Sequence, residues 1–437
     1  MKKLRTAMLP VEQLCIGLFV HLDLGWMSHP FPLGSFKIAS VDQIETIRSL
    51  GLTQVRICPE KSDLMALPPS MGGNAGALEP AAPVSAFMTA LAAEPLAPEV
   101  AAERQRREVL AAHREATLVC DRQFEEAGHV FAQASDMLQS DPVRARVHSE
   151  TLTRTLVDKM LIDGELCIRL LSESPGDRAC THSVNVAVVS LLMGRTFGLP
   201  ESDLLDLGVG ALLHDIGKSD VPAPVRHRDG RMSQDELLHY QQHVAHGVSQ
   251  ARRMGLAPGA LLVIAQHHEH SDGRGFPLHI GSDRMTAASR IVAMVNRYDN
   301  LCNPQVPAHA LTPHEAVSLM FAQDRDKFDT TMLGCFIKMM GVYPAGSVVQ
   351  LTDDRFALVM SVNSTRPLKP RVLVHDKDVP PEEAVLLDLE LEPRIGIRRS
   401  LKPAALPRDV LAYLSPRQSI NYFFEAARSV ESMAEAA

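Results

Sequence analysis

The sequence lacks long apolar runs, paired cysteine motifs and any excess of positive charge. No stretch reaches the roughly 18 apolar residues that a membrane-spanning helix requires. The seven cysteines of the 437-residue chain are scattered without a CxxC pair, which favours free thiols in a reducing compartment over a disulfide framework. The formal net charge of -8 argues against duplex nucleic acid and anionic membrane surfaces as partners. These absences predict a cytoplasmic protein.

The chain is too long for one ordinary compact domain, and its composition changes several times along its length. Apolar periodicity and turn residues predict a small mixed module at the start, mainly helical structure in the middle and short strands after Gly341. The expected division is a module at 1–62, an Ala/Pro-rich linker at 63–98, a helical connector at 99–149, a helical domain at 150–340 and a β-rich extension at 341–437.

Histidines are concentrated in the helical region, where ten of the 18 lie between His182 and His279. Histidine is the commonest side-chain ligand of transition metals, and carboxylates can bridge two such ions. A single histidine on an amphipathic helix is more often a core or surface residue. For the helix after Ser233, either His243 or His246 could be the ligand. The adjacent pair His267-His268, at a helix end before a Gly-rich loop, is the stronger signal.

The pair His214-Asp215 is the sharpest single feature of the sequence. The preceding helix is apolar and carries the pair into the core, where burying both side chains without partners would cost several kcal/mol. A bound cation would remove that cost. A salt bridge or a helix cap made by Asp215 would also remove it, so the dipeptide alone leaves both explanations open.

Together these motifs resemble the HD-GYP branch of the HD phosphohydrolase superfamily. The resemblance covers about residues 150–340 and follows the family's order of motifs: His182, His214-Asp215, Lys218, His243, His267-His268-Glu269 and Asp272-Gly273-Arg274-Gly275-Phe276-Pro277. The first 62 residues are similar to a small uncharacterised module often found ahead of such domains, most clearly at Gly25-Trp26 and His29-Pro30-Phe31. The predicted fold class is therefore mainly α, with an all-helical core, a small α/β module before it and a small β-rich extension after it.

The resemblance implies a cyclic di-GMP phosphodiesterase with a binuclear centre of iron or manganese. The implied metal ligands are His182, His214, Asp215, His243, His267, His268 and Asn296. Asp215 would bridge the two metals and take part in catalysis, and Lys218 would donate to a phosphate oxygen or to the leaving oxygen. The implied substrate-binding loop consists of Gly273, Arg274, Gly275, Phe276 and Pro277. The product would be the linear dinucleotide or GMP.

Three positions depart from the family pattern. Phe276 replaces the tyrosine of the signature loop, which removes a hydroxyl and keeps an aromatic ring. Arg178 stands where three-metal members carry a glutamate, which favours two metals. Asn296 stands where the family has a metal-binding aspartate, and a neutral amide binds divalent cations less strongly than a carboxylate. Asp299 follows about one helical turn later.

Two interpretations of the chain therefore stay open. The first is an active phosphodiesterase, and the second is a catalytically impaired signalling protein that binds cyclic di-GMP or a partner domain. A nucleotidase for another phosphate ester is a third, which the signature loop disfavours. Besides cyclic di-GMP, the expected partners are diguanylate cyclases or other signalling domains. The helix near residues 99–139 offers an interface for a homodimer.

Overall fold

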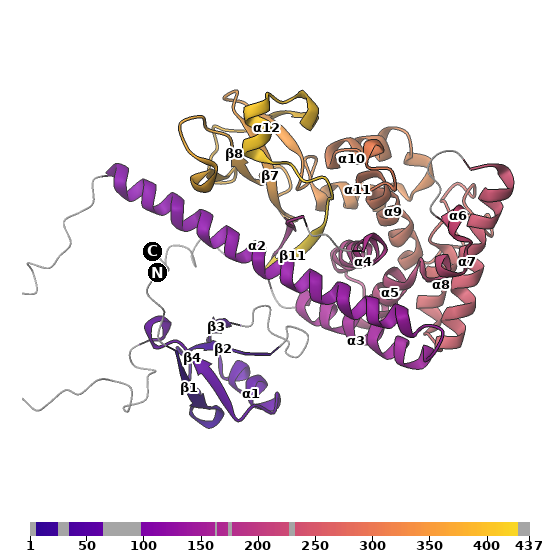
Figure 1. The fold of residues 1–437 in the computed structure, drawn as a ribbon, viewed down its shortest axis with the longest axis horizontal. Coiled ribbons are helices and arrows are strands. Elements are labelled where there is room, and N and C mark those ends of the chain that lie inside the picture. Colours follow the sequence, from indigo (N-terminus) through magenta and orange to yellow (C-terminus); the bar gives the residue numbers. More distant parts are fainter. Residues whose placement is uncertain are drawn as a thin grey trace, which may run out of the picture. The chain divides into compact units, whose positions relative to one another are not determined.

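The structure, a computed structural model, describes residues 6–24, 35–63, 98–161, 164–173, 177–226 and 232–426. Most of the expected linker, together with Gly25-Trp26 and His29-Pro30-Phe31, lies outside the described residues. The chain divides into two compact units, Met1–Gln105 and Arg106–Ala437 (Figure 1). Within the described ranges, no helix combines the length and apolarity needed to cross a membrane.

The described residues 6–63 of the first unit form a four-stranded antiparallel sheet and an α-helix. Its strands are β1 (Ala7–Pro10), β2 (Phe19–His21), β3 (Ser35–Lys37) and β4 (Gln54–Ile57), in the order β1-β4-β2-β3. Helix α1 (Val41–Ser49) begins at Ser40, whose side chain accepts a hydrogen bond from the Gln43 backbone. Ile44 and Ile47 of α1 join Val20, Val55 and Ile57 of the strands in one apolar core, as the α/β prediction required.

The second unit is mainly helical, which confirms the predicted fold class. It contains most of α2 (Pro98–Met137), followed by α3 (Pro142–Met160), α4 (Arg178–Thr196), α5 (Glu201–Leu213), α6 (Ala223–Arg226), α7 (Gln234–Met254), α8 (Pro258–Gln266), α9 (Ala287–Cys302), α10 (Pro313–Ala322), α11 (Thr330–Met340) and α12 (Arg408–Leu414). Helix α4 is buried on all sides between Ser183 and Gly194, as expected of a central helix. It packs against α3, α5, α9 and α11.

A second antiparallel sheet lies against the helices. Its strands are β5 (Leu166–Leu170), β6 (Val348–Leu351), β7 (Phe356–Asn363), β8 (Arg371–Val374), β9 (Val385–Asp388), β10 (Ile397–Leu401) and β11 (Tyr422–Ala426). The backbone order is β10-β6-β7-β5-β11, and β8 pairs with β7 and β9. Strand β5 precedes α4 in the chain but pairs with both β7 and β11, a long-range pairing that the sequence analysis did not anticipate.

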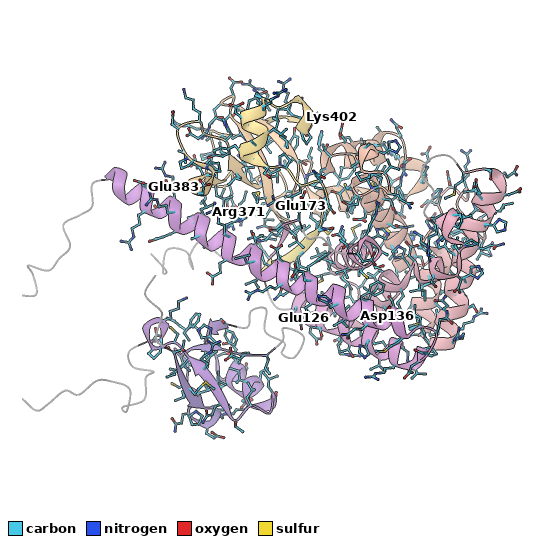
Figure 2. The ribbon with its side chains drawn as sticks, in the orientation of Figure 1. Glu126, Asp136, Glu173, Arg371, Glu383 and Lys402 are labelled. Atoms are coloured by element: carbon cyan, nitrogen blue, oxygen red, sulfur yellow. The ribbon has the colours of Figure 1, made fainter. Side chains whose placement is uncertain are left out.

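Ion pairs connect this sheet region to the helices. Lys402 Nζ lies 2.9 Å from Glu315 Oε1 at the start of α10, and Arg107 of α2 lies 3.0 Å from Glu383 (Figure 2). A buried contact adds to them, because Arg169 of β5 contacts Glu425 of β11 and donates to His113 of α2 at 2.7 Å. The sheet is therefore anchored to the helical part through both charged and buried contacts.

Candidate metal centre

Backbone packing brings the His214-Asp215 pair to the middle of the helices. Helix α5 is buried from Leu207 to Leu213 and ends at His214, and a 3-10 turn (η5, Ile216–Asp220) follows Asp215. Gly217 of this turn contacts α7 so closely that a Cβ there would lie 2.0 Å from the His243 carbonyl oxygen. Only glycine permits that approach, and it places Asp215 beside His243.

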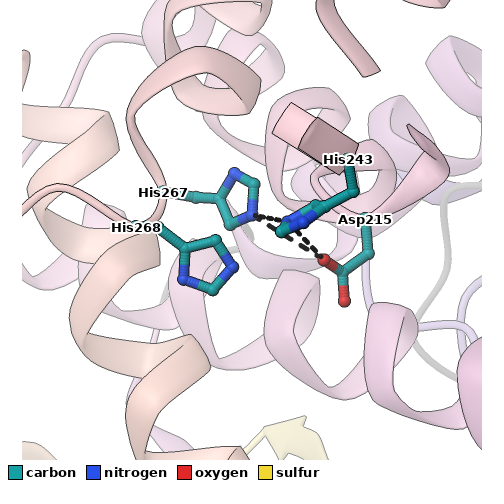
Figure 3. A group of neighbouring side chains, drawn as sticks. All are labelled: Asp215, His243, His267 and His268. Carbon is teal, nitrogen blue, oxygen red and sulfur yellow. Dashed lines mark hydrogen bonds and ion pairs between the residues drawn. The ribbon is translucent and has the colours of Figure 1, made fainter. Parts of the chain in front are cut away.

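Two groups of potential ligands share the Asp215 carboxylate. One group is His182, His214 and Asp215, and the other is Asp215, His243, His267 and His268; within each, the ligand atoms all lie within 4.8 Å of one another. The Nε2 atoms of His182 and His214 are 3.6 and 3.4 Å from Asp215 Oδ2. Those of His243 and His267 are each 3.7 Å from Oδ1 (Figure 3). Each carboxylate oxygen thus faces a different pair of imidazoles.

The Nδ1 atoms of three of these histidines contact backbone carbonyl oxygens. His214 Nδ1 lies 2.6 Å from the Ala211 carbonyl oxygen, His243 Nδ1 lies 2.6 Å from that of Tyr240, and His267 Nδ1 lies 2.8 Å from that of Ile264. A carbonyl can only accept, so each Nδ1 carries the proton and each Nε2 presents a lone pair. Such backing contacts are typical of metal-ligating histidines.

This donor set fits divalent metal ions. Among the described residues, Asp215 Oδ1 and His268 Nε2 are buried without a hydrogen-bond partner, which is costly unless a cation satisfies them. The Nε2 atoms of His243 and His267 are only 3.3 Å apart, with a lone pair on each. Mixed imidazole and carboxylate ligands suit iron, manganese or zinc.

The protonation states also match those of metal ligands. Burial lowers the pKa of His243 to about 4 and lowers the pKa of His267 and His268 well below the ordinary value, so these rings are neutral at pH 7. Burial opposes ionisation of Asp215, but the positive charge of Lys218 outweighs it, and the pKa of this carboxyl lies far below its usual range. Metal ions bind neutral imidazole and ionised carboxylate.

Lys218 lies directly at the shared carboxylate. Its Nζ donates to Asp215 Oδ2 at 2.5 Å and lies 5.5 Å from the centre of the Tyr240 ring. The negative charge of Asp215 keeps the pKa of Lys218 raised despite burial, so the lysine is a cation at neutral pH. Tyr240, which sequence reasoning did not single out, also contacts the Lys218 amine. Its position one helical turn before His243 could have indicated from the sequence that it lies near the site.

The signature loop packs against the second ligand group. Phe276 stacks on His268, with ring centroids 4.4 Å apart and an interplanar angle of 21°. A Cβ at Gly275 would lie 2.4 Å from the His268 carbonyl oxygen, so this glycine serves a backbone contact. The fully buried Glu269 carboxylate accepts from the backbone N–H groups of Leu278 and Ile280. Glu269 thereby anchors the loop that carries Gly273, Arg274 and Pro277.

Two polar residues of α9 lie near the expected site. Asn296 is buried, and its side-chain oxygen Oδ1 accepts a hydrogen bond from the Asn300 side-chain amide at 2.6 Å. Asp299, one turn later, instead contacts a predicted ligand, with its Oδ2 2.5 Å from His182 Nδ1. Of the two histidines considered on α7, the described groups contain His243 and not His246. Arg178 donates to the Asn303 carbonyl at the end of α9.

Two known domain families match this chain. The HD domain (HD_5) matches residues 165–332, and a domain of unknown function (DUF3391) matches residues 7–144. The HD match contains all the histidines of the two ligand groups and Asp215.

Several characterised relatives carry phosphodiesterase names. Cyclic di-GMP phosphodiesterase PA4108 of Pseudomonas aeruginosa is 26% identical over 370 residues, which are 84% of each chain. Cyclic di-GMP phosphodiesterase PdeB of Borreliella burgdorferi is 22% identical over 44% of this chain and 50% of its own length. The 3'3'-cGAMP-specific phosphodiesterase 3 of Vibrio cholerae is 25% identical over 37% of this chain and 35% of its own length.

Among solved structures, the Bdellovibrio bacteriovorus protein Bd1817, described as an HDG"Y"P protein, aligns with 76% of this chain and 97% of its own. Its sequence identity is 14% and its TM-score is 0.39. The family matches thus place an HD domain at residues 165–332 and a DUF3391 module on its N-terminal side, and the motifs of the HD domain resemble those of the HD-GYP branch.

Proposed function

We propose that this chain is a metal-dependent phosphodiesterase that hydrolyses cyclic di-GMP to the linear dinucleotide or to GMP. The observation that carries the proposal is the arrangement around Asp215, whose two oxygens face two separate groups of histidines. The names of the relatives support the reaction class. In this proposal residues 150–340 form the phosphohydrolase domain, and two iron or manganese ions are its cofactors.

The proposed ligands are His182, His214, Asp215, His243, His267 and His268, with Asn296 as a weaker one. When bound, two divalent cations would polarise phosphoryl oxygens and lower the pKa of water. Lys218, held as a cation beside Asp215, would donate to a phosphate oxygen or stabilise the leaving oxygen. The aromatic face of Phe276 would support the loop of Gly273, Arg274, Gly275 and Pro277 against the dinucleotide.

The test combines metal analysis with turnover by full-length protein purified without oxygen. Wild-type protein should bind two metals per chain and hydrolyse cyclic di-GMP, and the His214→Ala/Asp215→Ala double variant should lose both properties. His239→Ala is the matched control, because His239 lies one turn before His243 on the same helix but is exposed and outside the ligand groups. Wild-type protein that binds metal but hydrolyses no cyclic dinucleotide would contradict the proposal.

The choice of dinucleotide needs its own measurement, because relatives are named for cyclic di-GMP and for 3'3'-cGAMP. We expect a higher kcat/KM for cyclic di-GMP. The same protein preparation with both substrates gives the ratio directly, and a preference for 3'3'-cGAMP would correct the substrate without changing the reaction.

Asn296 supports one alternative function, a receptor for the dinucleotide with impaired catalysis. Its side-chain oxygen accepts a hydrogen bond from Asn300, and a neutral amide binds divalent cations less strongly than the carboxylate of the family pattern. Asn296→Asp distinguishes the two functions. Inactive wild-type protein that still binds cyclic di-GMP, with turnover restored by the aspartate, would establish the receptor.

A further inference from the structure

The C-terminal strand lies beside the helices that carry the metal centre. Strand β11 pairs with β5 from Tyr422↔Leu170 to Ala426↔Leu166 and packs against α4 (Figure 1). Just before it, the Gln418 N–H donates to the Glu173 carboxylate (Figure 2). The segment 418–426 is thus fixed against the chain that leads into α4, the helix of His182.

Two asparagines connect this segment to Asp299. Asn185 Oδ1 accepts from the Tyr422 backbone N–H at 2.8 Å, and its Nδ2 donates to Asp299 Oδ1. Asn303 Oδ1 accepts from the Ile420 N–H at 2.8 Å, and its Nδ2 donates to the Ile420 carbonyl at 2.8 Å and to Asp299 Oδ1 at 2.9 Å. Every amide atom has a partner of the opposite kind, which fixes both side chains.

Asp299 in turn holds His182. The Asp299 side chain is 2% exposed. Its carboxylate therefore needs hydrogen-bond donors from other protein groups, because water cannot reach it. The two asparagines occupy Oδ1, which leaves Oδ2 for His182 Nδ1 at 2.5 Å. With Nδ1 so engaged, His182 Nε2 faces Asp215 Oδ2 and lies 3.2 Å from His214 Nε2.

We propose that segment 418–426 is a positioning element of the metal centre, which acts through Asn185, Asn303 and Asp299 to orient His182 as a ligand. The inference rests on the proposed function, since it requires that His182 bind metal. Asp299, Asn185 and Asn303 are positioning residues in this scheme. The extension after the helical domain then contributes to the centre itself as well as to the fold.

Metal titration of the full chain tests the proposal, with Mn²⁺ as the probe and metal content per chain as the readout. Asp299→Ala and Asn303→Ala should weaken one of the two metal sites, by about 10- to 100-fold for Asp299, and leave the other unchanged. Asn303 is only partly buried, so its variant keeps the test decisive if Asp299→Ala does not fold.

Tyr298→Phe is the matched control. The Tyr298 hydroxyl bonds to the Tyr422 hydroxyl at 2.8 Å. The proposed link to Asp299 instead uses the Tyr422 backbone N–H, which donates to Asn185, so this variant removes a side-chain contact of the same segment and keeps that link. It should lower the melting temperature and leave both metal affinities unchanged. If wild-type protein binds two Mn²⁺ ions, and Asp299→Ala and Asn303→Ala bind both with unchanged affinity, the positioning role is wrong and the proposed function still stands. Wild-type protein that binds no Mn²⁺, Fe²⁺ or other divalent metal would overturn both this role and the proposed function.

Discussion

Two ways of holding a histidine coexist in the candidate metal centre. His214, His243 and His267 each place Nδ1 on a carbonyl oxygen three residues earlier in the chain, so their own helical segments orient them. His182 is held by Asp299, which is 117 residues away. The first arrangement forms wherever the local helix forms, whereas the second exists only after α4, α9 and the C-terminal strand have packed together.

The comparison shows where the centre is sensitive to distant change. Local backing contacts survive as long as their helix does, so mutations far away should leave the His243 group unaffected. The His182 group depends on a chain of side chains, and each link can be removed separately.

The largest effect is expected at the residue that both groups share. Asp215→Asn replaces the carboxylate that both groups share by a neutral amide, so both groups should lose metal and turnover should fall by roughly 1,000-fold or more, as for residues that act as one catalytic unit. Metal content and kcat measure this. One fully retained metal would show that Asp215 belongs to a single group.

Gly217→Ala would break the local arrangement through the backbone. The added Cβ would collide with the His243 carbonyl oxygen and the Gly247 nitrogen, so η5 must move away from α7 at a cost of about 3 kcal/mol. Gly128→Ala is the control, because nothing lies within 4 Å of its Cβ in α2 and alanine should stabilise that helix by about 1 kcal/mol. Denaturant unfolding measures both, and equal effects would contradict the packing argument.

His113 extends the comparison to a histidine held at long range outside the centre. Burial and the neighbouring Arg169 lower its pKa from 6.5 to about 3. Below pH 6.5 His113 therefore binds a proton in the unfolded chain but stays neutral in the folded chain. The free energy of unfolding falls as the pH falls. This residue should account for about 2 kcal/mol of lost stability between pH 7 and pH 5.

Unfolding free energies of wild-type protein and His113→Gln, measured at both pH values, isolate this contribution from that of the other buried histidines. The glutamine keeps an acceptor for Arg169 and cannot be protonated in this range. An identical loss of stability in both proteins would show that His113 is not the group that titrates.

The smallest effect is expected at the start of α7. Ser233 and Glu236 form a capping box, so Ser233→Ala should cost about 1 kcal/mol of stability. Metal affinity should not change, because His243 is oriented by Tyr240 well inside the helix. Thermal unfolding and metal titration check the two statements, and a loss of metal would show that the cap positions the ligand.

Local patterns were readable from the sequence. The helix predicted near residues 99–139 appears as α2, the helix after Ser233 appears as α7, and several of the short strands predicted after Gly341 appear as β6 to β9. Strand β5 was not foreseen, because all five of its residues are buried and an uninterrupted buried run lacks the alternation that marks a half-exposed strand. Strand β11, its partner, was missed as well.

The sequence by itself determined the types of the candidate ligands, their order and the helices that present them, because these depend on local spacing and on a recognisable motif. Only the tertiary structure decided that the two oxygens of Asp215 face different histidines. It also decided that Asp299 reaches His182 with support from the C-terminal strand. Those contacts join residues more than a hundred positions apart, and such pairings follow from the packing of whole elements, which no local pattern specifies.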